Sequence, residues 1–296
     1  MSLSAYRIKI MTDSGSDIPR EYEKKHNIRI LCFPISVGEK SFYDRDMSDD
    51  EYYKLIQDSL KSADFPTTAQ VIKYTFSEVF NEYYEQGYTD LIYTAIAKDG
   101  SGTYFNAVSA REDFYNENPE AYGKYNIRII DSMNYTGVYG WPVIQAAIRA
   151  EQGESPDKIV TYIEDWCKHA EVNFGCFTLD FVKRSGRVST AAAFVGEMLG
   201  LRPVIRIRHA VSTTTAKVRG DKAVIPKVVD ITYDRIIPQT PYVIIAGSDK
   251  NAEAEMYREI TKKLGYPPEM TFYVGAAVAA NVGSCVIGTI FKAKQM

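Results

Sequence analysis

The first half of the chain, residues 1–153, alternates between short apolar runs and longer amphipathic stretches. Short apolar runs predict buried strands, whereas apolar positions at helical spacing predict amphipathic helices. The predicted strands are 6–11, 28–37, 91–96 and 127–130, and the predicted helices are 49–60, 70–86, one that begins near 102 and one that ends near 153. Strands that alternate with helices favour an α/β fold with a doubly wound parallel sheet.

The second half, residues 154–296, has a different rhythm, because strands follow one another directly. The predicted helices are 156–168, 190–199, 221–236 and 251–264, and the predicted strands are 173–179, 204–207, 211–215, 242–246 and two within 270–290. Adjacent strands beside helices favour a mixed α+β domain. We therefore predict two domains, an N-terminal α/β domain over 1–153 and a C-terminal α+β domain over 154–296.

The composition is that of an ordinary soluble globular protein, with 45% hydrophobic and 25% charged residues among 296. A net charge of −3 indicates no broad attraction to nucleic acid. No apolar run approaches the ~20 residues that span a bilayer, and the N-terminus lacks a signal-peptide pattern, so no integral membrane contact is expected. The cysteines are widely spaced without a CxxC pair, which favours a reducing cytoplasm.

A small polar loop, 97–103 (AKDGSGT), follows the predicted strand 91–96 and leads into a helix. Hydroxyls and backbone N–H groups at a helix N-terminus favour binding of a carboxylate or a phosphate. The loop has neither the P-loop nor the GxGxxG pattern, so a nucleotide site is not indicated. A simple helix-capping loop is the alternative interpretation.

Metal binding is not expected from the sequence. The three histidines lie far apart in the sequence, and neither a CxxC nor an HExxH motif accompanies them. Asp13, Asp44 and Asp131 lie at or near predicted strand ends, where they could hold Mg²⁺ in a crevice phosphotransferase. Capping of the following helices is the alternative role for these carboxylates, and we predict that the protein holds no metal.

Eight short segments, distributed in order over most of the chain, resemble motifs of the DegV family. They are 12–19 (TDSGSDIP), 42–44 (FYD), 67–70 (TTAQ), 101–104 (SGTY), 130–132 (IDS), 178–188 (TLDFVKRSGRV), 201–204 (LRPV) and 217–220 (KVRG). The resemblance implies a two-domain α/β protein that holds a long-chain fatty acid between its domains. It also implies that the protein presents the carboxylate to a separate fatty acid kinase subunit, which makes an acyl phosphate. The protein would then need no catalytic residues and no cofactor besides the bound fatty acid.

The same resemblance implies which residues hold the ligand. Thr68 is the clearest head-group residue of the family that this chain retains, and Ser101, Gly102 and Thr103 match the family's LSGTY loop. The segment 191–199 combines small residues with Phe194 and Met198, which could line a slot for the acyl chain. A tightly packed core helix is the alternative for that segment.

The chain departs from the family pattern at three polar positions. Ala97 and Lys98 replace paired serines, Ala69 replaces a serine, and Asn281 replaces a histidine near the C-terminus. Lys98 could pair with the carboxylate while Asn281 donates a hydrogen bond. Alternatively, Lys98 faces solvent, or the protein binds a different lipid or a different anionic head group.

A group of basic residues matches basic motifs of the family. Its members are Arg184, Arg187, Arg202, Lys217 and Arg219. The resemblance implies a surface near the pocket that receives the kinase or a phosphate. Solvated charges with local contacts are the alternative.

Overall fold

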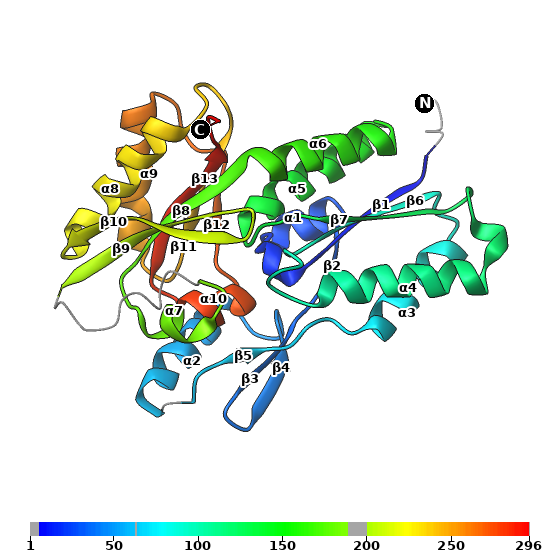
Figure 1. Cartoon of the computed structure of the whole chain (residues 1–296), viewed down its shortest axis with the longest axis horizontal. Coiled ribbons are helices and arrows are strands. Elements are labelled where there is room, and N and C mark those ends of the chain that lie inside the picture. The colour runs from blue at the N-terminus through cyan, green and yellow to red at the C-terminus, as the bar shows by residue number, and fades with distance from the viewer. Residues whose placement is uncertain (1–5, 63, 189–199, 296) are drawn as a thin grey trace.

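The computed structural model describes residues 6–62, 64–188 and 200–295, which form an elongated molecule with one sheet toward each end (Figure 1). The first sheet is entirely parallel and has the strand order β2-β1-β6-β7. Its strands are β1 (Ile8–Asp13), β2 (Arg29–Leu31), β6 (Asp90–Ala95) and β7 (Asn126–Asp131). The predicted parallel sheet of the N-terminal half is confirmed.

Helices cover both faces of the parallel sheet because its strands are apolar on both sides. Tyr93 packs in a cluster with the helices of one face, and its neighbour Ile92 packs with those of the other. The first face carries α3 (Lys73–Glu85) and α4 (Thr103–Glu117), and the second carries α5 (Gly137–Glu151) and α6 (Pro156–His169). Both faces of the parallel sheet are therefore covered by helices.

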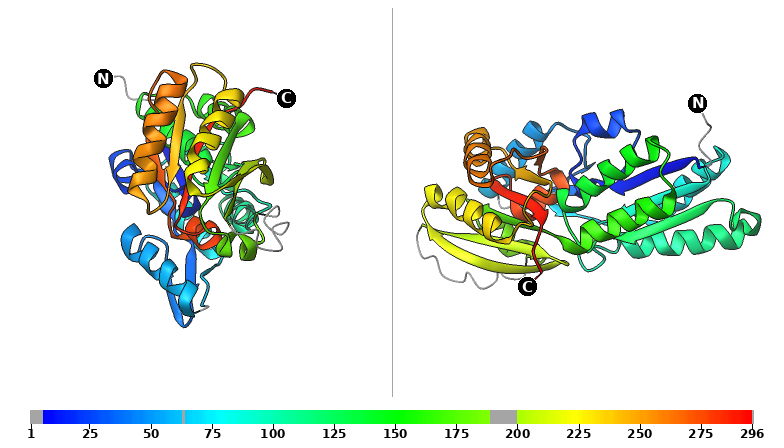
Figure 2. Two further views of the ribbon diagram at one scale, coloured as in Figure 1. Left: turned by 90° about the vertical axis from the view of Figure 1, so that its left-hand side faces the viewer. Right: turned by 90° about the horizontal axis from the view of Figure 1, so that it is seen from above.

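The second sheet is mixed and has the order β10-β9-β8-β13-β11-β12. Neighbouring strands are antiparallel except for β11 and β12. The strands are β8 (Ala170–Cys176), β9 (Leu201–Arg208), β10 (Val211–Arg219), β11 (Tyr242–Ala246), β12 (Thr271–Tyr273) and β13 (Val286–Lys292). Helices α8 (Val224–Arg235) and α9 (Lys250–Leu264) pack on one face, and Figure 2 shows them on the outer side of the molecule. The predicted mixed α+β half is confirmed.

The predicted strand region 28–37 is split between two sheets. Residues 29–31 form β2, whereas β3 (Pro34–Val37) joins a small antiparallel sheet with β4 (Lys40–Tyr43) and β5 (Thr67–Thr68). The chain leaves the parallel sheet at Phe33, whose N–H donates to Ser14 Oγ and whose carbonyl accepts from the Asp44 N–H. Pro34 then has no N–H with which to continue a ladder. Helix α2 (Asp49–Ser62) follows β4.

Residues 270–290 contain the two predicted strands and also a helix that was not predicted. Helix α10 (Ala276–Val282) lies between β12 and β13. Its seven residues are mainly alanine and valine, so it is too short and too uniformly apolar to show helical periodicity. Two further short helices are α1 (Arg20–Lys25) and α7 (Asp180–Ser185). The predicted helix 190–199 lies outside the described residues.

Helices α5 and α6 pack against each other and connect the two sheets (Figure 1). The turn between them contains the predicted domain boundary at 153/154, and this boundary stays a prediction. None of the helices in the described parts of the chain is both long and apolar enough to cross a membrane.

Candidate functional site

A cavity of about 410 Å³ lies between the two sheets. The loops that follow β1, β6 and β7 form one side, together with the β5–α3 connection. Strands of the second sheet and helix α10 form the other side. In open α/β sheets, ligands bind in the crevice at the carboxyl ends of the strands, so the position of this cavity is that of a ligand site.

The inner wall of the cavity is apolar. Its residues come from β8, β9, β11 and β13, and each is almost completely buried: Val172, Phe174, Ile207, Ile245 and Val286. Val172 and Phe174 are two positions apart on β8 and therefore face the same side of the sheet. A wall of branched and aromatic side chains suits a hydrocarbon and offers it no hydrogen bonds.

The outer rim of the cavity is polar. Thr68, Gln70, Ser101, Arg187 and Asn281 all line it and are at least partly exposed to solvent. Among the described residues, Arg187 is the one charged side chain in the cavity wall. The cavity therefore has an apolar interior and a polar, cationic mouth, which is the arrangement that an amphiphilic anion requires.

Four of the ligand residues predicted from the sequence come together in this cavity. Thr68, Ser101, Gly102 and Asn281 line it, although they lie on three segments far apart in the chain. One hydrogen of the Asn281 amide is used within α10, where Nδ2 donates to the Ala277 carbonyl at 2.9 Å. Since an amide nitrogen carries two hydrogens, the second can reach a ligand. The binding role of these residues stays a prediction.

The backbone of the loop after β6 is held from inside the protein. The N–H groups of Ile96, Ala97 and Lys98 donate to Asp13 Oδ2, the Asn134 carbonyl and Asp131 Oδ1, respectively. Those of Gly100 and Ser101 both donate to the Ala97 carbonyl. These five N–H groups already have acceptors within the protein, so they do not form the expected cradle for an anion. Polar side chains supply the rim instead.

Gln70 is a rim residue that the sequence analysis did not select. An added Cβ on Gly102 would lie 2.0 Å from Gln70 Oε1, so the Gln70 side chain would have to move if position 102 carried a larger residue. The sequence signal that could have identified Gln70 is its position in the 67–70 motif, which also contains Thr68. Gly102 thus shapes the rim by leaving space for the Gln70 amide.

Two other predicted residues lie elsewhere. Lys98 does not line the cavity; its side chain is 47% exposed, and its Nζ lies 3.8 Å from Asp131 Oδ2. Thr103 is fully buried, and its hydroxyl bonds with Ser101 Oγ and accepts from the Val71 N–H. Thr103 therefore stabilises the rim through its hydrogen bond with Ser101 and does not line the cavity. Phe194 and Met198 lie outside the described residues.

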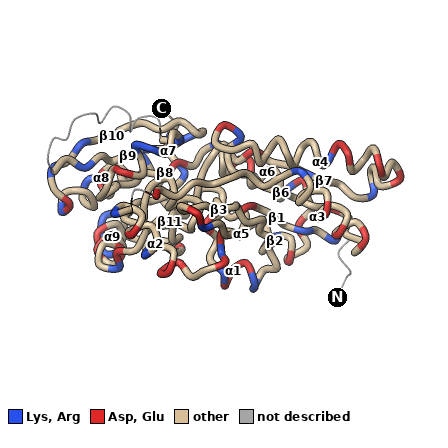
Figure 3. The backbone as a smooth tube through the Cα atoms, turned by 90° about the horizontal axis from the view of Figure 1, so that it is seen from below, with Lys and Arg blue, Asp and Glu red and all other residues tan. Residues whose placement is uncertain are grey.

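The five basic residues predicted for docking do not share one environment. Arg187 lies in the cavity wall, whereas Arg184 stacks over the Phe65 ring at 4.0 Å and Arg202 pairs with Asp221 at 2.6 Å. Lys217 and Arg219 are exposed on β10. Figure 3 shows cationic and anionic residues interspersed along the chain. A common docking surface for these five residues stays a prediction.

The strand-end carboxylates accept hydrogen bonds from the protein. Asp13 accepts from the hydroxyls of Tyr139 at 2.6 Å and Tyr93 at 2.9 Å, and burial raises its pKa to about 6. Asp44 accepts from the Ala277 N–H, and Asp131 accepts from the Met133 N–H. Within the described ranges, no three His, Cys, Asp or Glu side chains are grouped as metal ligands. The structure therefore gives the magnesium alternative no support in the residues it describes.

Comparisons with known sequences identify a family. The DegV family model, described as a family of uncharacterised proteins, matches residues 7–294. A DegV domain-containing protein of Clostridium perfringens is 29% identical over 285 residues, which cover 95% of this chain and 94% of that protein. One from Clostridium acetobutylicum is 28% identical over 291 residues, covering 97% and 99%.

Solved structures share the fold over nearly the whole chain. A stearic acid-binding protein from Eubacterium ventriosum has a TM-score of 0.84 at 24% identity, covering 97% of this chain and 98% of that one. A DegV family protein from Thermus thermophilus, described by its fatty acid binding, has a TM-score of 0.85 at 23% identity, covering 97% and 100%. The resemblance seen in the sequence is confirmed, and the protein belongs to the DegV family.

Proposed function

We propose that this protein binds a long-chain fatty acid, with the acyl chain inside the cavity and the carboxylate at its rim. The observation that carries the proposal is the division of one cavity into an apolar inner wall and a polar mouth. The solved relatives described as binding stearic acid or fatty acids support it. Each CH₂ group that leaves water contributes about 0.8 kcal/mol, so long chains bind much more tightly than short ones.

In this proposal, the carboxylate is held by side chains at the rim. Thr68 and Ser101 offer hydroxyl donors, Asn281 offers an amide hydrogen, and the Arg187 guanidinium offers a charge-assisted hydrogen bond. Arg187 donates within its own segment, to the Ser185 carbonyl at 3.0 Å, so its remaining N–H groups can point to a ligand. The charge of Arg187 takes the role that the sequence analysis gave to Lys98.

The proposal extends to a partner. A carboxylate held at an exposed rim stays accessible to a second protein, so the fatty acid would be presented to a separate cytoplasmic kinase that forms the acyl phosphate. The protein itself would supply binding and orientation but no catalytic residue and no cofactor. Arg219, which is exposed on β10, is a proposed kinase contact. Arg219→Glu is expected to reduce kinase-dependent phosphorylation while leaving fatty acid affinity unchanged, because it lies outside the cavity.

A second head group is favoured by one observation, the guanidinium at the rim. Arginine binds phosphate as well as carboxylate in a bidentate manner. A lipid with a single phosphate head group is therefore the alternative ligand class. No contact among the described residues favours the crevice phosphotransferase, because the strand-end carboxylates hold backbone N–H groups.

The test is a titration of the delipidated protein with three compounds that share one acyl or alkyl chain: palmitic acid, methyl palmitate and hexadecyl phosphate. The acid should bind with a Kd at least about tenfold lower than that of the ester, since the ester lacks the charge that the rim recognises. Tighter binding of the phosphate than of the acid would support the alternative head group. Equal affinity for acid and ester, or no binding of any of the three, would contradict the proposal.

A further inference from the structure

Three side chains from the first half of the chain hold the backbone just before and at the start of α10. Tyr53 Oη donates to the Val274 carbonyl at 2.7 Å. Asp17 Oδ1 accepts from the Gly275 N–H at 2.9 Å, and Asp44 Oδ2 accepts from the Ala277 N–H at 3.2 Å. The three side chains come from α2, from the end of the first 3₁₀ turn (Ser14–Ser16) and from the end of β4, and all three are at most 5% exposed.

The backbone that these side chains hold continues directly into the cavity wall. Val274, Ala277, Val278, Asn281 and Val282 all line the cavity. Helix α10 has only seven residues, and a helix this short has little stability of its own. Its first N–H groups have no partner within the helix, so a carboxylate that accepts from one of them stabilises its start. Contacts made from the other half of the chain therefore hold the backbone at the start of α10.

The carboxylates of Asp17 and Asp44 are buried, and burial disfavours their charged form. Burial raises the pKa of Asp17 well above its usual value and also raises the pKa of Asp44. Arg45 is the cation nearby, but its guanidinium bonds with Glu23 and the Ile18 carbonyl. Two buried carboxylates without a dedicated cation are a poor way to gain stability alone. Their contacts instead provide a fixed geometry for the backbone of 274–277.

We propose that Asp17, Asp44 and Tyr53 form a clasp that positions α10, and with it Asn281 and the apolar wall, for ligand binding. The clasp residues do not line the cavity, so they are positioning residues and not ligand contacts. The inference rests on the proposed function, because it names what shapes the same site. Gly275 fits the clasp, since an added Cβ would lie 3.0 Å from Asp17 Oδ1.

The test uses Asp44→Ala and Asp44→Asn in the full chain, with Asp90→Asn as the control. Asp90 is buried at the other end of the parallel sheet, so its variant reports a loss of stability far from the cavity. Each delipidated variant is titrated with cis-parinaric acid, a fluorescent fatty acid. Hydrogen exchange over residues 275–282 is measured in the same samples without ligand.

Asp44→Ala should raise the Kd about tenfold and speed exchange over 275–282, because the Ala277 N–H loses its acceptor. Asp44→Asn should restore both values to near wild type, since its amide oxygen still accepts that N–H. Asp90→Asn should leave both unchanged even if it lowers Tm. Unchanged exchange over 275–282 in Asp44→Ala would overturn the clasp whether or not the ligand binds, and so would an equal rise in Kd for Asp90→Asn. Normal exchange protection in a wild-type protein that binds no fatty acid would instead overturn the proposed function alone.

Discussion

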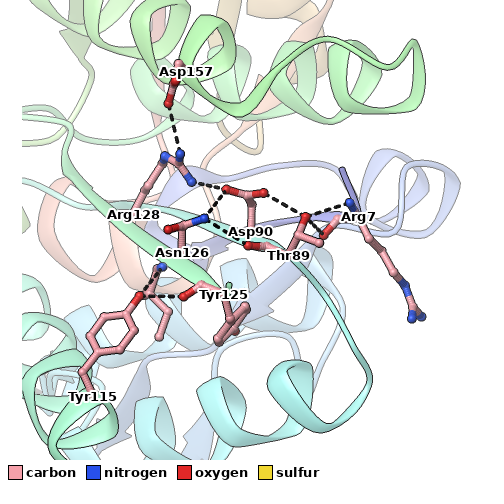
Figure 4. Close-up of polar contacts among 9 residues, drawn as sticks. Arg7, Thr89, Asp90, Tyr115, Tyr125, Asn126, Arg128 and Asp157 are labelled. Atoms are coloured by element: carbon pink, nitrogen blue, oxygen red, sulfur yellow. Dashed lines mark hydrogen bonds and ion pairs between the residues drawn. The ribbon is translucent and has the colours of Figure 1, made fainter. Parts of the chain in front are cut away.

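Buried carboxylates at the two ends of the parallel sheet have different kinds of hydrogen-bond partner. At the amino ends of the strands, Asp90 is 2% exposed and pairs with the Arg128 guanidinium, which also bonds Asp157 on α6 at 3.0 Å (Figure 4). Thr89 Oγ1 donates to the same Asp90 carboxylate at 2.9 Å. Charge at this end is neutralised within the protein, and the network ties β6 and β7 to α6.

At the carboxyl ends, Asp13 is equally buried but accepts from neutral donors, which are two tyrosine hydroxyls and the backbone N–H groups of Ile96 and Gly15. Asp13 holds the loop that carries Ser101, while the arginine of this region, Arg187, lies at the cavity rim. Buried carboxylates at the two ends of the same sheet therefore have different roles. The buried Asp90 is paired with an arginine, whereas the buried Asp13 binds neutral donors and places a loop, and Arg187 stays available to a ligand.

The largest effect on stability is expected from removing the Arg128–Asp90 ion pair at the amino ends of the strands. Arg128→Met leaves Asp90 buried without its cation, which should lower the free energy of unfolding by about 3 kcal/mol. Urea denaturation measures this loss. Fatty acid affinity at a temperature where the variant is folded should not change, because Arg128 is remote from the cavity. A changed Kd would mean that the two ends are coupled.

The second effect is the pH dependence of stability that Asp13 causes at the carboxyl end of the sheet. The pKa of Asp13 is raised from 3.8 to about 6 in the folded state, so the folded protein binds the proton more tightly than the unfolded chain. Its contribution to stability is complete below about pH 4 and is lost as the pH rises through about 6, a difference of about 3 kcal/mol. Denaturation of Asp13→Asn from pH 4 to pH 7 should lack this decline. Parallel curves for the variant and the wild type would show that Asp13 does not titrate in this range.

A smaller effect is expected at the rim. Arg187→Ala should raise the Kd for palmitic acid about tenfold, which corresponds to about 1.4 kcal/mol, because the carboxylate loses its cation. Arg184→Ala is the matched control, since Arg184 stacks over Phe65 and does not line the cavity. Binding of methyl palmitate should be the same in both variants. An equal loss for acid and ester in Arg187→Ala would indicate a packing role.

The smallest effect is expected for Lys98→Ala. Its side chain lies beside Asp131 and outside the cavity wall, so the Kd for palmitic acid should change by less than about twofold. The same titration measures it. A loss as large as that of Arg187→Ala would return Lys98 to the head-group role considered from the sequence.

Local patterns in the sequence predicted the two sheets and most of their helices. Apolar runs such as 91–96 define buried strands by composition alone, and the polar loop that follows this strand indicated one side of the cavity. The DegV motifs then selected Thr68 and Asn281, which no local pattern singles out. The structure places both in one cavity wall.

The remainder depends on contacts between distant segments, which leave no local signal. Helix α10 is too short and too uniformly apolar to give a helical pattern. The carboxylates that accept from the N–H groups of Gly275 and Ala277 belong to Asp17 and Asp44, more than 230 positions earlier in the chain. Arg187 is a rim residue because the segment that follows α7 reaches the cavity, and a lone arginine in a sequence is usually a solvated charge. The orientation of the Ile96 and Lys98 N–H groups likewise depends on distant residues, Asp13 and Asp131.

The central claim is that one cavity holds a fatty acid with its carboxylate at the rim of Thr68, Ser101, Arg187 and Asn281. Native mass spectrometry of the purified protein, followed by organic extraction and identification of the released compound, tests it most directly. We predict one bound fatty acid of ~14–18 carbons per chain, because a shorter chain leaves apolar wall in contact with water. Release of a phosphorylated lipid, or a protein that remains empty after incubation with fatty acids, would contradict the account.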